Sequence, residues 1–302
     1  MKFSVFQMSR KGGRQNNEDR MGYCYTRDSG LFVLADGMGG HPEGEVAAQM
    51  ALQIVAESFQ REAKPKVRDL SGFLSSAALA AHHALVCYAS DKAMLDTPRT
   101  TIVALVVQGN NATWVHCGDS RLYLVRGGQL LARTADHSFL EQRRGSVSPL
   151  AYANRNILYT CLGSPTQPVL EATGPVPLHQ GDKLLLCSDG LWDSVRESDI
   201  VEQLSQHSVS KAIPNLVELA LHNAGPRSDN VSAIALEWET PDAFESKRNI
   251  STEDIPDGEF ASTFQDWALG ALEDELDDAT IERSIAEINE VIRRSAARKS
   301  SL

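Results

Sequence analysis

The sequence predicts an α+β fold in which antiparallel β-sheets are layered with α-helices. The first observation is a succession of short apolar segments joined by turn sequences such as Gly109-Asn110-Asn111 and Arg126-Gly127-Gly128, which are typical of hairpins. The second is a pair of long amphipathic segments, 43–63 and 69–90, whose apolar faces must cover a sheet. Consecutive hairpins exclude a doubly wound parallel sheet, so helices packed on antiparallel sheets remain.

The N-terminal part of the chain is predicted as three short strands followed by two helices. The strands fall within residues 1–36, and the third, an apolar run over 31–35, ends at Asp36. In the first helix, over 43–63, apolar side chains recur at helical spacing. These side chains are Val46, Ala47, Met50, Ile54, Val55 and Phe59.

The central part is predicted as a run of strands, followed by an irregular segment and a second group of helices. Residues 145–168 show no clear periodicity and carry prolines. The predicted strands are 100–107, 112–117, 122–125, 129–134, 183–188 and a closing strand at 231–238, with helices at 198–206 and 210–223.

The composition changes after Trp238, which predicts a domain over residues 1–240 and an acidic extension over 241–302. The extension carries 15 acidic and 7 basic side chains. It is predicted as a linker over 241–258 and an amphipathic helix over 264–294. Four isoleucines at 4-3-4 spacing form a narrow apolar seam on this helix (Ile281, Ile285, Ile288 and Ile292). The helix could fold back on its own domain, dock a partner or a second copy, or inhibit the domain through acidic residues that mimic phosphate.

Composition and charge narrow the class of protein. The 302 residues are 42% hydrophobic and 23% charged, as in ordinary globular proteins. A formal net charge of −11 argues against nucleic-acid binding, which needs a basic face. No apolar run approaches the roughly 18–20 residues of a membrane span, and the start of the chain has no signal-peptide pattern. Five cysteines without a Cys-x-x-Cys spacing favour reduced thiols, so a cytoplasmic location is expected.

Carboxylates lie at the ends of several predicted core strands. Asp36 and Asp189 directly follow apolar runs, and Asp229 just precedes another. A sheet fixes such side chains in place, and several converging carboxylates repel one another unless cations lie between them. Oxygen ligands favour hard ions such as Mg²⁺ or Mn²⁺, so a metal site is expected.

Six short motifs appear in an order that resembles the bacterial form of the metal-dependent serine/threonine protein phosphatases of type 2C. The resemblance covers roughly residues 1–240. It implies a four-layer α/β/β/α sandwich of two antiparallel sheets flanked by helices, with the metal site at one end between the sheets. The motifs are Arg14-x-x-x-Glu18-Asp19, Asp36-Gly37-Met38-Gly39-Gly40-His41, Thr100-Thr101, Gly118-Asp119-Ser120-Arg121, Asp189-Gly190-Leu191-Trp192-Asp193 and Asp229-Asn230.

The resemblance implies a site for two divalent ions. Asp36 would bridge the two ions, and the carbonyl of Gly37 would bind one of them. Asp189 and Asp229 would bind the other. Taken singly, each aspartate could equally be a turn or helix-cap residue; their joint occurrence in family order favours the metal site.

Three further acidic residues are candidate ligands. By resemblance, Glu18 and Asp19 would act on or just behind the Gly37 ion, largely through bound water. Asp119 would hold a third, weaker ion. The alternative for Asp119 is a hairpin carboxylate paired with Arg121.

Arg14 and His41 are the candidate catalytic residues. A guanidinium matches two phosphate oxygens at once, and the resemblance makes Arg14 the phosphate-binding residue; the alternative is a surface arginine. His41 could give a proton to the leaving alkoxide near neutral pH. A helix-capping role for His41, or proton donation by a metal-bound water, are its alternatives.

The expected activity is hydrolysis of phosphoserine and phosphothreonine on proteins by a metal-activated water. The expected partners are phosphorylated proteins and a cognate serine/threonine kinase in a signalling pathway. Two alternatives stay open. One is a catalytically inactive phosphatase fold used as a signalling or binding module, which would lack metal carboxylates. The other is a phosphatase of a small phosphoester.

Overall fold

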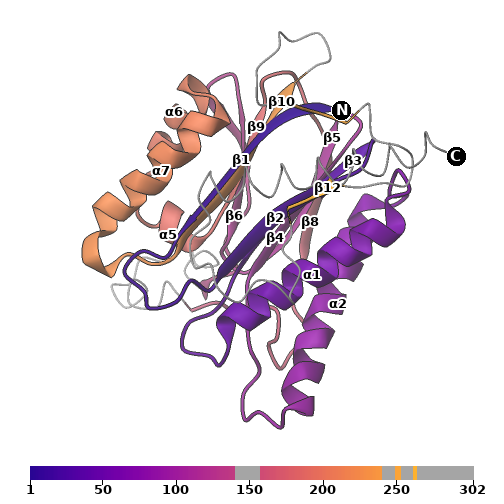
Figure 1. Cartoon of the computed structure of the whole chain (residues 1–302), viewed down its shortest axis with the longest axis vertical. Coiled ribbons are helices and arrows are strands. Elements are labelled where there is room, and N and C mark those ends of the chain that lie inside the picture. The colour runs from indigo at the N-terminus through magenta and orange to yellow at the C-terminus, as the bar shows by residue number, and fades with distance from the viewer. Residues whose placement is uncertain (140–156, 240–248, 253–260, 264–302) are drawn as a thin grey trace, which may run out of the picture.

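A computed structural model of the chain describes residues 1–139, 157–239, 249–252 and 261–263. Its elements form four layers, with two antiparallel sheets in the middle and helices on both outer faces (Figure 1). The predicted α/β/β/α sandwich is confirmed.

The first sheet has the strand order β11-β1-β10-β9-β6-β7, and every neighbouring pair is antiparallel. Strands from the two ends of the described chain therefore lie side by side in it. In spatial order the strands are β11 (Asn249–Ser251), β1 (Lys2–Arg10), β10 (Val231–Glu239), β9 (Lys183–Cys187), β6 (Arg121–Arg126) and β7 (Gln129–Arg133).

The second sheet has the order β12-β2-β3-β4-β5-β8, again with antiparallel neighbours throughout. Its central strands β3 and β4 are almost wholly buried, which explains their continuous apolar sequences. In spatial order the strands are β12 (Ala261–Ser262), β2 (Asp19–Tyr25), β3 (Ser29–Asp36), β4 (Ile102–Gln108), β5 (Asn111–Cys117) and β8 (Glu171–Pro177).

The helices enclose each sheet from outside and create three apolar cores. Helices α1 (Gly44–Glu62) and α2 (Leu70–Asp91) cover the second sheet. Helices α6 (Glu197–Gln206) and α7 (Val209–Ala224) cover the first sheet. The third core fills the space between the two sheets. A single turn, α5 (Asp189–Trp192), follows β9, and a 3-10 turn, η1 (Gly225–Arg227), follows α7.

The strand register brings the acidic motifs to one end of the sandwich. Asp19 at the start of β2 lies opposite Asp36 at the end of β3. Arg10 at the end of β1 lies opposite Val231, just after Asp229 and Asn230. Because β9 ends immediately before Ser188 and Asp189, the first sheet delivers its motifs to the same end.

Three strands depart from the sequence predictions. The edge strand β8 was not predicted, because its seven residues include glycine and two prolines and all but one are exposed. Strand β11 lies within the segment predicted as a linker, and β12 follows it. The isoleucine seam of the predicted tail helix lies outside the described residues, as do residues 145–156 of the predicted irregular segment.

Helix α2 is long and apolar enough to cross a membrane by length and composition alone, with a mean hydropathy of 1.4 over its most apolar window. The sequence was expected to hold no apolar run of that length. In the structure α2 contributes Phe73, Leu74, Ala81 and Leu85 to the core beneath the second sheet. A core helix of this kind meets the same compositional test.

Candidate metal centre and active site

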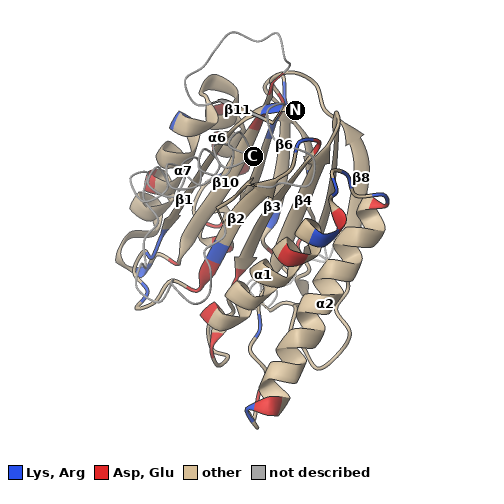
Figure 2. Cartoon of the chain, turned by 45° about the vertical axis from the view of Figure 1, so that its right-hand side comes forward, with Lys and Arg blue, Asp and Glu red and all other residues tan. Residues whose placement is uncertain are grey.

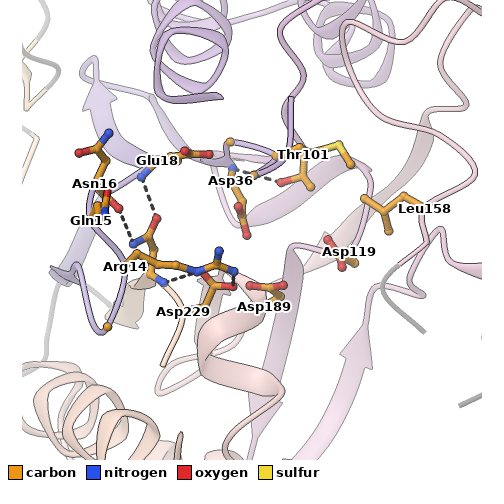
Figure 3. A pocket seen from close by; sticks show the side chains of 16 residues that line it. Arg14, Gln15, Asn16, Glu18, Asp36, Thr101, Asp119, Leu158, Asp189 and Asp229 are labelled. Carbon is orange, nitrogen blue, oxygen red and sulfur yellow. Dashed lines mark hydrogen bonds and ion pairs between the residues drawn. The ribbon is translucent and has the colours of Figure 1, made fainter. Parts of the chain in front are cut away.

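A cavity of about 570 Å³ opens at the acidic end of the sandwich, between the ends of the two sheets. Figure 3 shows carboxylates from separate segments pointing into it. Six of the nine predicted site residues line the cavity through their side chains, and Gly37 lines it as well. The six are Arg14, Glu18, Asp36, Asp119, Asp189 and Asp229.

The double threonine holds the backbone of Asp36 in place. The backbone N–H of Asp36 donates to Thr101 Oγ1 at 3.1 Å, and the N–H of Thr101 donates back to the Asp36 carbonyl at 2.8 Å. The hydroxyl of Thr100 donates to the same carbonyl at 2.9 Å. With its backbone fixed in this way, Asp36 directs its carboxylate into the cavity (Figure 3).

The buried carboxylates of Asp36 and Asp189 are repelled by their acidic neighbours. Burial, followed by the charges of Asp19 and Asp189, raises the pKa of Asp36 well above its ordinary value. Burial, followed by the charges of Asp119 and Asp229, does the same to the pKa of Asp189. A divalent cation between them would remove this repulsion and restore the ionised forms.

Asp19 has a buried carboxylate oxygen that is free to bind a cation. Its side chain is buried, and Oδ2 accepts a hydrogen bond from Ser188 Oγ at 2.8 Å. Its other oxygen, Oδ1, has no hydrogen-bond partner among the described residues. Burial is the main cause that raises the pKa of Asp19 to about 6. Because buried acceptors are almost always satisfied, an unpaired carboxylate oxygen here fits a cation or its bound water.

Gly37 and Glu18 are packed tightly against the start of α1. A Cβ atom at Gly37 would lie 2.4 Å from the carbonyl oxygen of Gly44 and 2.8 Å from that of Glu18, so only glycine fits. The N–H of Gly37 donates to the Glu18 carbonyl at 3.1 Å. Burial, followed by the charge of Glu45, raises the pKa of Glu18. The residues predicted to share one ion are therefore close neighbours.

Arg14 lies across the mouth of the cavity and pairs with a predicted metal ligand. Its Nη2 is 2.5 Å from Asp229 Oδ2, and its side chain is 55% exposed. This hydrogen bond is the main cause that raises the pKa of Arg14. An exposed guanidinium beside the carboxylate cluster can reach an incoming phosphate while it stays anchored at the site.

His41 does not line the cavity, although the preceding residues Gly39 and Gly40 do. Its Nδ1 is 2.8 Å from Asp96 Oδ2, and Asp96 also accepts from Arg99 Nη2 at 2.9 Å. A carboxylate partner orients the imidazole ring and leaves Nε2 available. The proton-donor role of His41 stays a prediction.

Asp119 is held by a group that the sequence analysis did not identify. Arg121 does not pair with it; instead Arg121 makes a double hydrogen bond to Asp136, at 2.7 Å to each oxygen. The guanidinium also lies 3.5 Å above the ring of Trp192, whose Nε1 donates to the Asp119 carbonyl at 3.0 Å. Burial, then the charge of Asp136, raises the pKa of Asp119 to about 7, and Asp193 adds to the shift.

A second group of possible ligands, His116, His137 and Glu171, lies beside this region. His137 Nδ1 accepts from the Gly118 N–H at 3.2 Å, so the proton of its neutral ring is on Nε2, which is 3.4 Å from Glu171 Oε1. Burial lowers the pKa of His137 to about 4, which keeps the ring neutral. His137 Nε2 and His116 Nδ1 are buried without a hydrogen-bond partner among the described residues, and a proton on Nε2 argues against His137 as a metal ligand.

Comparisons with known proteins agree with this geometry. Residues 8–218 match the model of the family described as Protein phosphatase 2C. The chain is 36% identical over 227 residues to the serine/threonine protein phosphatase PstP of Mycobacterium tuberculosis, an alignment that covers 73% of this chain and 42% of PstP. It is 30% identical over 240 residues to the serine/threonine phosphatase Stp of Listeria monocytogenes, covering 77% of this chain and 94% of Stp.

Solved structures give the same result. The crystal structure of the PstP catalytic domain in complex with two manganese ions has a TM-score of 0.65 and 33% identity, and the match covers 79% of this chain and 99% of that one. A second crystal structure of the mycobacterial phosphatase has a TM-score of 0.67 and 34% identity, covering 80% of this chain and 100% of that one.

Proposed function

Because this chain belongs to the protein phosphatase 2C family, we propose that it hydrolyses phosphoserine and phosphothreonine esters on proteins. The proposal includes two divalent cations, Mn²⁺ or Mg²⁺, held by Asp36, the Gly37 carbonyl, Asp189 and Asp229. Glu18 and Asp19 would support the ion at Gly37, and Asp119 would hold a third. When bound, such ions acidify water into a nucleophile and neutralise phosphate charge.

The observation that carries this proposal is the convergence of buried carboxylates that repel one another. Asp36 ends a strand of one sheet and Asp189 follows a strand of the other, yet the charge of Asp189 helps to raise the pKa of Asp36. Burial and the charges of Asp119 and Asp229 raise the pKa of Asp189, and Asp19 Oδ1 has no hydrogen-bond partner among the described residues. A fold keeps repelling charges together at a cost in stability only where another component offsets them. The chemistry of an all-oxygen set selects a hard divalent ion.

Arg14 and His41 are proposed to act on the substrate. Arg14 can exchange its hydrogen bond to Asp229 for the oxygens of a phosphate, since its guanidinium is exposed at the cavity mouth. His41, oriented by Asp96, is placed to supply a proton to the leaving serine or threonine oxygen. A catalytically inactive module is not favoured, because every predicted acidic position is present at the cavity or directly behind it.

The proposed partners follow from the proposed reaction. The substrates would be phosphorylated proteins, and a serine/threonine kinase that forms the same phosphoesters would be the opposing enzyme in a signalling pathway. A cytoplasmic location is part of this proposal, as is a partner-binding or self-association role for the predicted tail helix.

Hydrolysis of a phosphothreonine peptide tests the proposal. With Mn²⁺ we expect release of inorganic phosphate, and with EDTA we expect none. A parallel assay with a small aryl phosphate separates the alternatives: a small-molecule phosphatase would prefer the aryl phosphate by kcat/KM. Full activity in chelator would contradict metal dependence, and no activity on either substrate with Mn²⁺ or Mg²⁺ would support the inactive module.

A further inference from the structure

The loop that carries Arg14 is exposed and is held by hydrogen bonds from the segment around Ser228 and Asn230. It joins β1 to β2, and residues 12–16 are exposed. Gly12 adopts a φ of +62°, and its neighbour Gly13 donates through its N–H to the carbonyl and hydroxyl oxygens of Ser228, at 3.0 and 2.9 Å. Because such a loop gains little from its own packing, its position depends on hydrogen bonds from its surroundings.

Asn230 provides those hydrogen bonds at both ends of the loop. Its Nδ2 donates to the carbonyl of Lys11 at 2.9 Å and to the carbonyl of Asn16 at 3.0 Å. Its Oδ1 accepts from the N–H of Glu18 at 2.8 Å. Asn230 is only 6% exposed, so its amide is largely shielded from bulk water. One buried amide therefore closes the loop and joins it to an acidic residue of the cavity.

The same residue is tied to the metal centre through its backbone. The N–H of Asn230 donates to Asp229 Oδ1 at 2.8 Å, and Asp229 Oδ2 is the oxygen that pairs with Arg14. A Cβ atom at Gly190 would lie 2.1 Å from the Asn230 carbonyl oxygen, so the turn after Asp189 is packed directly against it. Asn230 thus connects the loop of Arg14, Glu18 and two metal-ligand segments.

We propose that Asn230 is a positioning residue that fixes Arg14 for phosphate binding, an inference that rests on the proposed function. It acts through the loop and does not itself touch the substrate. Only an amide supplies two donors and one acceptor here: aspartate would present an oxygen to the carbonyls of Lys11 and Asn16, and alanine would leave three backbone groups without their partner.

A double-mutant cycle between Asn230 and Arg14 tests this role. In the Mn²⁺-loaded full chain we expect Asn230→Ala to raise KM for a phosphothreonine peptide about 10-fold, with a smaller change in kcat. Arg14→Ala should then cost far less in the Asn230→Ala background than in the wild type, because the arginine is already displaced. Asn215→Ala, at an exposed amide of α7, is the matched control.

Hydrogen exchange provides a readout that does not depend on activity. In the metal-free chain, the peptide covering residues 11–18 should exchange faster in Asn230→Ala and Asn230→Asp, with melting temperatures that show both variants folded. Equal effects of Arg14→Ala in both backgrounds, together with unchanged exchange, would overturn the role of Asn230. An inactive wild type with faster exchange in the variants would instead refute the proposed function and retain the anchoring of the loop.

A separate observation concerns the opposite end of the sandwich, where two C-terminal segments pair with the sheets. Strand β11 pairs with β1, with Ser251 opposite Lys2 and Asn249 opposite Ser4. Strand β12 pairs with β2, with Ala261 opposite Tyr25. Without these segments β1 and β2 would be edge strands of the two sheets. In Figure 2 the label of β11 lies beside the N-terminus.

A threonine follows each segment and fixes it to the adjacent strand or turn. Thr252 is fully buried; its N–H donates to the Met1 carbonyl at 3.1 Å, and its hydroxyl donates to the Arg27 carbonyl at 2.6 Å. Thr263 donates through its N–H to the Tyr23 carbonyl at 2.9 Å and accepts from the Tyr23 N–H at 3.0 Å. Both segments lie beyond residue 218, where the family match ends.

We infer that residues 249–252 and 261–263 are an intramolecular cover for two neighbouring sheet edges and belong to the folded unit. The edges are adjacent, since Phe3 of β1 and Tyr25 of β2 are in edge-to-face contact at 5.8 Å. Unpaired edges invite pairing with other chains, and a covering segment prevents it. The domain boundary predicted at residue 240 would cut this cover away.

Substitutions in the full chain test the cover. We expect Thr252→Val with Thr263→Val to lower the melting temperature by about 3–6 °C and to speed amide exchange at the start of β1 and the end of β2. Thr166→Val, at an exposed threonine, is the control. Peptide hydrolysis should be unchanged, because the edges are remote from the metal centre. Melting and exchange equal to the control, or a parallel loss of Mn²⁺ binding, would overturn the inference.

Discussion

Buried aspartates lie at both ends of the sandwich, and among the described residues Asp182 at one end pairs with an arginine whereas Asp19 at the other does not. At the end remote from the cavity, Asp182 precedes β9 and is fully buried, with hydrogen bonds from Arg126 Nε and Nη2 at 2.8 and 2.6 Å. At the cavity end, Asp19 is 3% exposed; its Oδ2 accepts from the hydroxyl of Ser188, and its Oδ1 has no hydrogen-bond partner among the described residues.

The difference shows how the same residue type can serve stability at one place and function at another. The ion pair of Asp182 with Arg126 stabilises the folded state. Asp182 Oδ2 also accepts a hydrogen bond from the N–H of His179 at 2.8 Å. The aspartates of the cavity end repel one another, so the protein alone does not satisfy them. The proposed metal centre therefore lies where the folded protein leaves carboxylate charges unpaired.

The largest expected effect comes from Asp36→Asn at the cavity end. With metal present, kcat should fall by about 10³-fold or more, the scale of losing one preorganised electrostatic group. The melting temperature of the metal-free chain should stay the same or rise, because the substitution removes a buried charge whose pKa the fold raises. Steady-state kinetics and calorimetry measure the two effects. Activity near that of the wild type would remove Asp36 from the metal site.

The matching substitution at the other end, Asp182→Asn, should do the opposite. An asparagine would keep one of the two hydrogen bonds between this side chain and Arg126 and lose the charge. Because Arg126 is 29% exposed and can reach water, we expect a cost of about 2–3 kcal/mol in the free energy of unfolding. Denaturant unfolding measures this cost, while kcat and KM of the folded variant should be unchanged. A lower kcat or higher KM without a loss of stability would contradict a purely structural role of Asp182.

A smaller effect is expected for Arg14→Ala. The loss of a charge-assisted hydrogen bond to phosphate should weaken substrate binding by about 1–3 kcal/mol, seen mainly as a higher KM. Arg196→Ala is the matched control, since Arg196 is 82% exposed and pairs with Asp199 on the surface of α6. Unchanged KM and kcat would show that Arg14 is a surface arginine that does not bind phosphate.

The sequence predicts most of the fold because its strands and helices have strong local patterns. The apolar run over 31–35 became β3, which ends at Asp36 as expected, and the helix predicted over 69–90 is α2. The edge strand β8 has no such pattern, since its exposed residues bury no face. Strands β11 and β12 are short and pair with residues more than two hundred positions away, so their formation depends on tertiary contacts that no local pattern contains.

The site was predictable to a similar degree. Asp36, Asp189 and Asp229 stand at strand ends, where sequence pattern and resemblance agree. The supporting group of Arg121, Asp136 and Trp192 was missed, because nothing in the sequence shows that Arg121 binds the carboxylate fifteen residues later and not its neighbour Asp119. The anchoring role of Asn230 was missed for the same reason, since three of its hydrogen bonds reach residues more than two hundred positions away.

Calorimetric titration of the full chain with Mn²⁺ tests most directly the claim that the unbalanced carboxylates form a metal centre. The wild type and Asp182→Asn should each bind at least two ions, whereas Asp36→Asn and Asp189→Asn should lose that binding while they remain folded. Equal Mn²⁺ binding in all four proteins, or none in the wild type, would contradict the account.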